Sequence, residues 1–337
     1  MSLYCGIDLH ANNSVIAVLD EQDKVLLERR LPNELSQILE ALVPYRSELA
    51  GCVVESTYNW YWLVDGLMDA GLVVHLAHTA AVPQYAGIKY TNDQSDARHL
   101  AHLLRLGILP KGHILPREER AVRDLLRRRL LLVRQKTLHH LSLQSLMARH
   151  TGLRLSANEI KRLDAQGIAE RLEGPVVLGG QLSMLAIHWL EDAIALIERE
   201  VRKHLAARPE YKLLTTIPGI GEALGSTIAL ETGHIERFPG PGHYASYARC
   251  VKTEKVSNGK LKGRGNAKNG NKYLAWAFME AAHYATIWSP SIKRYYQRKQ
   301  ARSHILVAKK AVANKLARAC YHMLRNQEPF DVKRAFG

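Results

Sequence analysis

Residues 2–20, SLYCGIDLHANNSVIAVLD, decide the fold of the N-terminal part of the chain. SLYCGIDLH and NSVIAVLD are rich in β-branched and alternating apolar residues, which is typical of strands, and Ala11, Asn12 and Asn13 can form the turn between them. KVLLERRL at residues 24–31 continues the pattern as a third strand. The chain is therefore expected to begin with a β-meander.

Helices and buried strands alternate after the meander. We expect an amphipathic helix over residues 34–45, the buried strand GCVVES, a helix over residues 60–68 and the strand LVVHLA ending at Ala77. Thr91 or Asn92 can cap a further helix that runs to about residue 106. This alternation predicts an open α/β sheet.

The remainder of the chain is predicted to be mainly helical. Leucines recur at helical spacing over residues 117–150 and again over residues 180–205, so these runs can pair as an antiparallel or an intermolecular coiled coil. Such a coiled coil would serve as a spacer or an oligomerisation arm. A basic helix is expected over residues 303–325. We therefore predict three domains: an α/β domain at 1–115, a helical coiled-coil region at 116–208 and a mainly α-helical domain at 209–337.

The formal net charge of +15 at pH 7 is unevenly distributed along the 337 residues. Residues 1–104 have 6 basic and 13 acidic side chains, a net −7, whereas residues 240–337 have 20 basic and 4 acidic ones, a net +16. Such asymmetry indicates that the C-terminal part binds a polyanion, and nucleic acid is the expected partner. A basic surface without a specific partner is the alternative.

The cysteine pattern and the hydropathy exclude several classes of protein. The four cysteines lie far apart without a Cys-x-x-Cys pair, so neither a disulfide framework nor a zinc site is indicated. No apolar run approaches the ~18 residues of a membrane span, and the N-terminus lacks the pattern of a signal peptide. We expect a soluble protein of the reducing cytosol with no membrane partner.

Four acids of the N-terminal part are candidates for a metal site. Asp8 and Glu55 lie at the ends of apolar strands, where an ionised group is costly unless it is paired, protonated or bound to metal. Asp93 and Asp96 are three residues apart and share one helix face. If the four converge, these hard oxygen ligands select Mg²⁺ or Mn²⁺, and such sites catalyse phosphodiester cleavage or transfer.

Other interpretations of these acids remain open. Acids in a first helical turn favour the helix dipole, which is an ordinary structural explanation for Asp93 and Asp96. A strand–turn–strand opening with an early aspartate also occurs in actin-like ATPases. That class adds a second phosphate loop after a later strand, whereas the Asp-x-Gly at Asp69 follows a predicted helix and precedes a strand.

Two glycine-containing segments of the C-terminal part are candidates for phosphate contact. IPGIG at residues 217–221 resembles a helix–hairpin–helix turn, whose glycines let backbone amides approach a phosphate; a plain turn between helices is the alternative. Residues 255–273, KVSNGKLKGRGNAKNGNKY, combine six basic residues with four glycines and no acid. Ser257 is the one serine of this loop. It is an ordinary turn former or phosphate donor unless a metal site activates it as a nucleophile.

Basic side chains can neutralise phosphates, and glycine tolerates the dihedral angles of a loop that closes on a nucleic-acid backbone. The predicted nucleic-acid-binding residues are Gly219, Gly221, Lys255, Lys260, Lys262, Arg264, Lys268, Lys272, Arg127, Arg128 and Arg129.

Taken together, these segments resemble the DEDD-type transposases of bacterial insertion sequences, the family numbered 110, and within it the 1111 subgroup. The resemblance spans nearly the whole chain in the family's order. It rests on Gly6-Ile7-Asp8, Glu55-Ser56-Thr57-Tyr58, Asp93-Gln94-Ser95-Asp96-Ala97-Arg98, Ile217-Pro218-Gly219-Ile220-Gly221, Arg237-Phe238, Ala245-Ser246-Tyr247, Ser257-Asn258-Gly259, Gly270-Asn271 and Pro329-Phe330-Asp331.

The resemblance implies a RuvC-like, RNase H-type N-terminal domain in which Asp8, Glu55, Asp93 and Asp96 bind Mg²⁺, with Mn²⁺ as the substitute ion. It also implies that Ser257, in a C-terminal transposase domain, attacks the DNA phosphate and forms a covalent phosphoserine link. The active site would be shared between subunits of a dimer or tetramer. Donor and target DNA would be chosen by base pairing with a structured non-coding guide RNA (a bridge RNA) encoded by the element. The protein would act in the bacterial cytoplasm, at the nucleoid.

Two departures from the family pattern concern the serine. The family commonly has Gly directly after Ser, whereas Asn258 intervenes here, and the usual Leu-Arg after Gly-Asn is Leu274-Ala275. Ser246 in YASYARC is therefore the alternative nucleophile. Two alternative functions also remain: a RuvC-like junction nuclease that uses metal-bound water, and a nucleic-acid-binding scaffold whose acids are structural.

Overall fold

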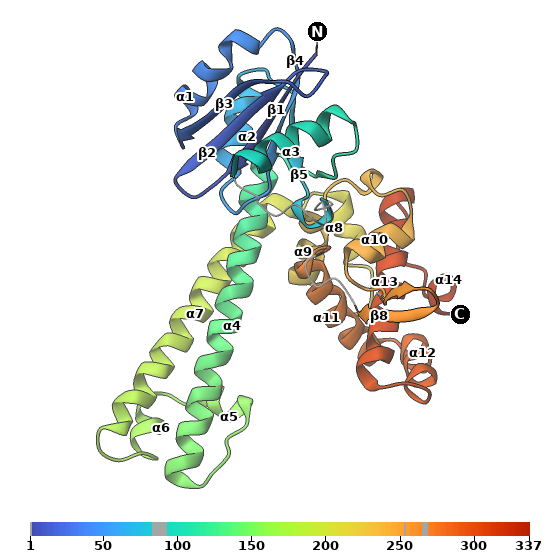
Figure 1. Ribbon diagram of the computed structural model, residues 1–337. Helices are drawn as coiled ribbons and strands as arrows, with labels where there is room; N and C mark the ends of the chain where they lie inside the picture. Colours follow the sequence, from blue (N-terminus) through green and yellow to red (C-terminus); the bar gives the residue numbers. More distant parts are fainter. Residues whose placement is uncertain (1, 83–92, 253, 265–268) are drawn as a thin grey trace. The chain divides into compact units, whose positions relative to one another are not determined.

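The computed structural model describes residues 2–82, 93–252, 254–264 and 269–337. The chain divides into two compact units, residues 1–115 and residues 116–337 (Figure 1). Each unit is described by itself. The further division of the second unit at residue 208 stays a prediction, and the proposed caps Thr91 and Asn92 lie outside the described residues.

The first unit is built on a six-stranded sheet of order β3-β2-β1-β4-β5-β6. Neighbouring strands are antiparallel from β3 to β1, parallel from β1 through β4 to β5, and antiparallel again between β5 and β6. The expected meander and the expected open α/β sheet are thus both present. The strands are β1 Leu3–Leu9, β2 Asn13–Leu19, β3 Val25–Pro32, β4 Leu49–Glu55, β5 Val74–Ala77 and β6 Lys111–Gly112.

Helices cover both faces of this sheet. Alternate residues of a strand point to opposite faces, so the odd-numbered residues of β1 pack with α1 (Leu35–Leu42) and α2 (Tyr61–Asp69) in one apolar core. The even-numbered residues face α3 (Asp93–Arg105), which packs on β1 and β2. Short 3-10 turns, η1 Val43–Tyr45 and η2 Thr79–Ala81, complete the unit. The face under α3 contains Asp8.

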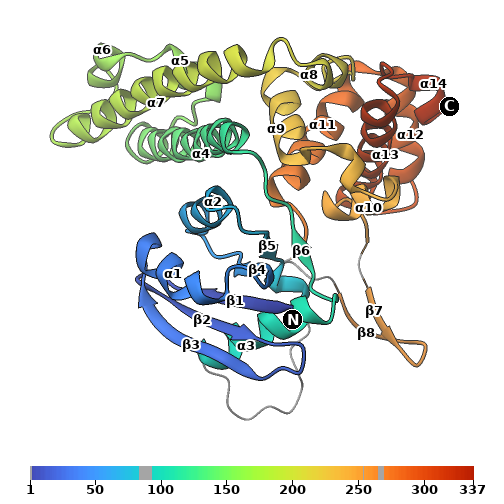
Figure 2. The same cartoon turned by 90° about the horizontal axis from the view of Figure 1, so that it is seen from above.

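Two long helices dominate the N-terminal part of the second unit. α4 (Arg117–Thr151) and α7 (Val176–Leu205) pack side by side, and α5 (Ala157–Arg162) and α6 (Ala165–Ala169) connect them (Figures 1 and 2). Buried leucines and isoleucines from both helices form the contact along its length. The antiparallel pairing within one chain is therefore confirmed.

The remainder of the second unit is a helical domain around a single apolar core that includes Tyr244 and Phe278. The predicted basic helix is α13, which spans Ile305–Asn326. The other elements are α8 Pro209–Leu214, α9 Glu222–Thr232, η3 Ile235–Arg237, α10 Pro241–Tyr247, the hairpin β7 Glu254–Ser257 and β8 Lys260–Arg264, α11 Lys272–Trp288, α12 Pro290–Gln300 and α14 Val332–Phe336. In the part of the chain that the structure describes, no helix is long and apolar enough to span a bilayer.

Candidate functional site

Asp8 and Glu55 lie side by side at the carboxyl ends of two parallel strands. β1 and β4 are in register up to Ile7 and Val54, so the next residue on each strand is an acid. Asp8 is 3% exposed. Burial, together with a hydrogen bond to Asp8 and the charges of Asp8 and Asp96, raises the pKa of Glu55 to about 8. The Glu55 carboxyl therefore keeps its proton near neutral pH, as expected of a partly buried acid that has no cationic partner among the described residues.

The first turn of α3 adds Asp93 and Asp96 to this strand end. Burial and the charges of Asp8 and Asp93 raise the pKa of Asp96 above its ordinary value. By contrast, a hydrogen bond from Arg30 lowers the pKa of Asp93. The four predicted acids thus interact electrostatically in one cluster, in which the pKa values of Glu55 and Asp96 are raised and that of Asp93 is lowered.

Gly6 explains why α3 can bring its acids so close to the sheet. A Cβ atom on Gly6 would lie 2.0 Å from the backbone oxygen of Ala97 and 2.7 Å from the backbone nitrogen of Ala101, distances that real side chains do not adopt. Gly6 and Asp8 are two residues apart and face the same side of the sheet. The Gly-Ile-Asp motif therefore combines a glycine that lets α3 approach the strand closely with a buried carboxylate that could bind a metal.

His10 and Arg30 belong to the same cluster, although the sequence analysis did not select them. Nε2 of His10 lies 3.3 Å from Oδ2 of Asp8 and 3.2 Å from Oδ2 of Asp93. Arg30 pairs with Asp93 from the neighbouring strand β3. The spacing of His10 two residues after Asp8 was a usable signal, because alternate strand residues share a face. No comparable local signal points to Arg30.

The cluster has the donor set of a divalent metal site. Single ligand atoms of Asp8, His10 and Asp93 all lie within 4.8 Å of one another. Burial is the main cause of the raised pKa of Glu55, and the charges of Asp8 and Asp96 add to it; a divalent cation would offset both effects. Carboxylate oxygens suit Mg²⁺ and Mn²⁺, and one imidazole nitrogen is compatible with Mn²⁺. The residues present therefore fit a hard divalent ion.

Ser257 lies at the end of β7, directly before the turn of a two-stranded hairpin. It pairs in register with Lys260 of β8, and the two residues between them, Asn258 and Gly259, have φ angles of 50° and 69°. A two-residue turn with both φ angles positive matches the twist of the flanking strands and favours Asn-Gly. The inserted Asn258, a departure from the family pattern, thus has a local structural reason.

The residues that flank the hairpin segment, on its two sides, are hydrogen-bonded to each other. The Asn271 N–H donates to the Tyr247 oxygen at 2.6 Å, and Nη2 of Arg249 donates to the Gly270 oxygen at 2.9 Å. Gly270 has a φ of 81°, and a Cβ there would lie 2.6 Å from the Tyr247 oxygen. Both ends of the segment that carries Ser257 are therefore held at the α10–α11 junction.

A buried ion-pair network lies under this junction. Glu231 of α9, 5% exposed, accepts bonds of 2.7 and 2.9 Å from Arg127 and a 2.7 Å bond from Nδ2 of Asn271. Oδ1 of Asn271 accepts bonds from the amides of Tyr273 and Leu274 and so caps α11. The guanidinium of Arg127 also lies over the Tyr273 ring, 4.5 Å from its centroid. Arg127, a predicted nucleic-acid contact, is thus an internal link between α4 and the base of the hairpin.

The other predicted contacts differ in how far they are free to meet a partner. Arg129 pairs with Glu198 at 2.6 Å, whereas Arg128 is exposed on the same helix. Lys260, Lys262 and Lys272 are exposed; Lys255 lies on β7 and Arg264 on β8, and Lys268 lies outside the described residues.

The two glycines of the predicted hairpin turn have different surroundings. Gly219 has a φ of 90°, and a Cβ there would lie 2.4 Å from the backbone nitrogen of Ala285, so packing against α11 already requires glycine. Gly221 precedes α9, and a Cβ there would meet nothing within 4 Å. Ser246, the alternative nucleophile, is exposed on α10, between the buried Ala245 and the half-buried Tyr247.

Comparisons with known proteins agree with this arrangement. Residues 5–151 match the DEDD-type transposase model of the IS110 family, and residues 211–297 match the model described as transposase IS116/IS110/IS902 family. The chain is 27% identical to the transposase for insertion sequence element IS1328 of Yersinia enterocolitica, over 94% of the chain and 95% of the relative. It is 23% identical to a probable family 20 transposase of Pseudomonas aeruginosa, over 96% of each chain. A segment of 120 residues, 36% of the chain, is 30% identical to an uncharacterized 43.6 kDa protein of insertion element IS110 from Streptomyces coelicolor. The segment covers 29% of that protein.

Proposed function

We propose that this chain, which belongs to the IS110 family of insertion-sequence transposases, cuts and rejoins DNA through a covalent phosphoserine at Ser257 and an acidic metal site at Asp8. The observation that carries the proposal is the carboxylate cluster at the ends of β1 and β4, in the region that matches the DEDD model. The sheet order, with a meander followed by parallel strands, supports the RuvC-like fold in which such clusters bind metal.

Asp8, Glu55, Asp93 and Asp96 would hold Mg²⁺, with Mn²⁺ as the substitute ion. The ion, when bound, polarises the phosphate and stabilises the attacking and leaving oxygens. Arg30 holds the Asp93 carboxylate ionised, and burial keeps Asp8 at a fixed position. The protein's own contribution is therefore a rigid set of carboxylates that is incompletely charged until a cation arrives.

Ser257 would supply the nucleophile. Its hydroxyl oxygen forms a bond to the DNA phosphorus, the bond between phosphorus and the 3′ oxygen breaks, and the serine proton ends on the released 3′ hydroxyl. The product is a 5′-phosphoserine link, which keeps the energy of the broken phosphodiester for rejoining. The backbone position supports this role, because Ser257 directly precedes a two-residue turn in a segment whose flanking residues Arg249 and Gly270 are hydrogen-bonded to each other.

The acidic unit of one subunit would meet the serine hairpin of another, in a dimer or tetramer. An apolar stripe on α7 supports oligomerisation, since five large side chains spaced by three, four or seven residues are between 56% and 64% exposed. They are Leu178, Leu182, Leu185, Trp189 and Leu196. This exposed stripe, which lies apart from the buried contact between α4 and α7, fits a helix of a partner subunit.

Donor and target DNA would be selected by a structured guide RNA at the bacterial nucleoid. The 20 basic residues against 4 acidic ones in residues 240–337 support binding of nucleic-acid backbones, and the exposed Lys260 and Lys262 lie on the serine hairpin itself. Sequence choice by base pairing leaves the protein to recognise backbone shape.

A denaturing adduct assay tests the proposal. The protein is incubated with both DNA substrates, the element's RNA and Mg²⁺, and DNA that stays attached after denaturation is measured. We expect the adduct to disappear in Ser257→Ala and in Asp8→Asn and to persist in Ser246→Ala, the matched serine control. Strand cleavage that survives Ser257→Ala would favour the junction nuclease with metal-bound water. Recombination that proceeds without RNA would remove the guide from the account.

A further inference from the structure

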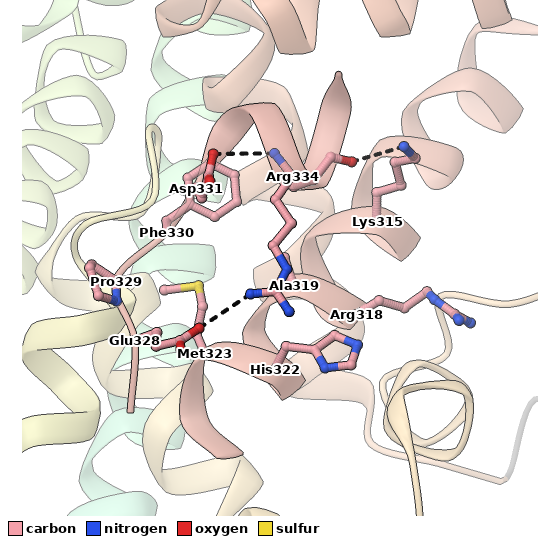
Figure 3. A pocket seen from close by; sticks show the side chains of 11 residues that line it. Lys315, Arg318, Ala319, His322, Met323, Glu328, Pro329, Phe330, Asp331 and Arg334 are labelled. Carbon is pink, nitrogen blue, oxygen red and sulfur yellow. Dashed lines mark hydrogen bonds and ion pairs between the residues drawn. The ribbon is translucent and has the colours of Figure 1, made fainter. Parts of the chain in front are cut away.

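A groove between α13 and the C-terminal tail lies outside the residues assigned so far. It has a volume of about 300 Å³, in the range of small-ligand sites. One side is the face of α13 that presents Lys315, Arg318, Ala319, His322 and Met323, and the other is the tail with Pro329 and Phe330 and the start of α14 (Figure 3).

The tail side of the groove is fixed by hydrogen bonds. The Phe330 N–H donates to Oγ1 of Thr216 at 3.1 Å, which ties the tail to the end of α8. The Asp331 carboxylate accepts bonds of 2.8 and 3.2 Å from the amides of Lys333 and Arg334 and so caps α14. The groove is thus formed before any ligand binds.

The charges of the groove are unbalanced. The lining has three cationic side chains, Lys315, Arg318 and Arg334, against the two acids Glu328 and Asp331. Glu328 is paired with Arg334 at 3.3 Å, and Oδ1 of Asp331 accepts bonds from two amides of α14. Nζ of Lys315 donates to the Ala335 oxygen at 2.8 Å rather than to an acid. Among the described residues Arg318 forms no ion pair, and in Figure 3 neither it nor His322 is joined to a neighbour. The groove therefore favours an anion.

The lining also has apolar members. Ala319, Phe330 and Met323, which is 5% exposed, line the groove together with the charged side chains. A ligand with a planar apolar face and a neighbouring negative charge satisfies both parts of the groove. A nucleotide has this combination, and stacking on an apolar or aromatic surface is how proteins bind unpaired bases without reading their sequence.

We propose that this groove binds one unpaired nucleotide of a DNA single strand, with the base against Phe330 and Met323 and its phosphate at Arg318. DNA is chosen because the chain belongs to a family of DNA transposases and because the net charge of +16 over residues 240–337 suits a polyanion. This role is separate from cleavage. The groove would hold a strand that has left its duplex, and this binding does not depend on Ser257.

Short single strands test the proposal directly. The full-length protein is titrated with fluorescent fifteen-nucleotide oligothymidylate, with an abasic strand of the same length and charge, and with a duplex. We expect the normal strand to bind on the order of tenfold more tightly than the abasic strand. Ala319→Phe, which fills the groove without changing charge, should remove this preference and leave duplex binding unchanged. Retained duplex binding also shows that the variant is folded.

Charge variants separate the groove from the rest of the basic surface. Arg318→Ala should lower the salt dependence of single-strand binding by about one counterion, whereas Arg325→Ala, an exposed arginine of the same helix outside the groove, should leave the base preference intact. Equal affinity for normal and abasic strands, or an unchanged preference in Ala319→Phe, would overturn the proposal. A base preference seen with RNA but not with DNA would overturn the choice of DNA.

Discussion

Replacing Gly6 by alanine should separate α3 from the sheet and so disassemble the acidic cluster. The new Cβ would lie 2.0 Å from the Ala97 oxygen, whereas non-bonded carbon contacts are comfortable only beyond about 3.4 Å. The obstructing atoms are backbone, so no side chain can rotate away. The helix as a whole has to move by roughly 1 Å, and Asp93 and Asp96 move with it.

Two magnitudes follow from this displacement. Overpacking a core by one methyl group costs about 1–3 kcal/mol of stability. A misplacement of about 1 Å at reacting groups can cost about 100-fold in rate. We therefore expect Gly6→Ala to lower the free energy of unfolding of the first unit by about 1–3 kcal/mol and to reduce the rate of DNA cleavage about 100-fold.

Gly51→Ala on the adjacent strand β4 is the matched control. A Cβ on Gly51 would lie 3.5 Å from the His75 ring, which is ordinary contact, so stability should change by less than about 1 kcal/mol and cleavage should stay near the wild-type rate. Urea denaturation measures the first quantity and a strand-cleavage assay the second. If Gly6→Ala cleaves DNA as fast as Gly51→Ala, the close approach of α3 does not set the geometry of the site.

Three further predictions concern other parts of the molecule. The pKa of Glu55 rises from its ordinary value of 4.5 to about 8. Its contribution to the stability of the metal-free protein should therefore be complete below pH 4.5 and should be lost as the pH rises through about 8. Urea titrations across that range should show this decline, and Glu55→Gln should remove it. Asn271→Ala removes the cap of α11 and one partner of Glu231, so it should lower the free energy of unfolding by about 1 kcal/mol or more and reduce adduct formation. Asn271→Asp keeps the cap but places a second acid against Glu231, so it should not restore the adduct. Leu185→Glu with Trp189→Glu on the exposed stripe of α7 should lower the mass measured by light scattering, and an unchanged mass would exclude that stripe as an interface.

The secondary structure of the first unit could be predicted because its signals are local. Strand alternation in residues 2–31 and the position of Asp8 and Glu55 at strand ends depend on neighbours in sequence, and the structure has the meander and both acids where they were expected. The glycine in Gly6-Ile7-Asp8 was noticed as a motif. Its reason, the backbone of α3 against the strand, needs a contact across about ninety residues and could not be seen in the sequence.

The side chains that the sequence analysis missed are those with distant partners. Arg30 of strand β3 reaches Asp93 of helix α3, and no local feature of KVLLERRL predicts this partner. Phosphate binding by Arg127 stays a prediction, but its pairing with Glu231, more than a hundred residues away, could not be seen in the basic run. Charge patterns identify a basic helix, but only the fold decides which of its arginines are already paired.

Peptide mapping of the DNA adduct tests the central claim most directly. Trypsin cleaves after lysine and arginine, so Ser257 falls in the peptide of residues 256–260 and Ser246 in the separate peptide of residues 238–249. After nuclease digestion of the adduct, mass spectrometry should find the remaining nucleotide phosphate on the peptide of residues 256–260. Phosphate on residues 238–249, or cleaved DNA with no modified peptide, would contradict Ser257 as the nucleophile.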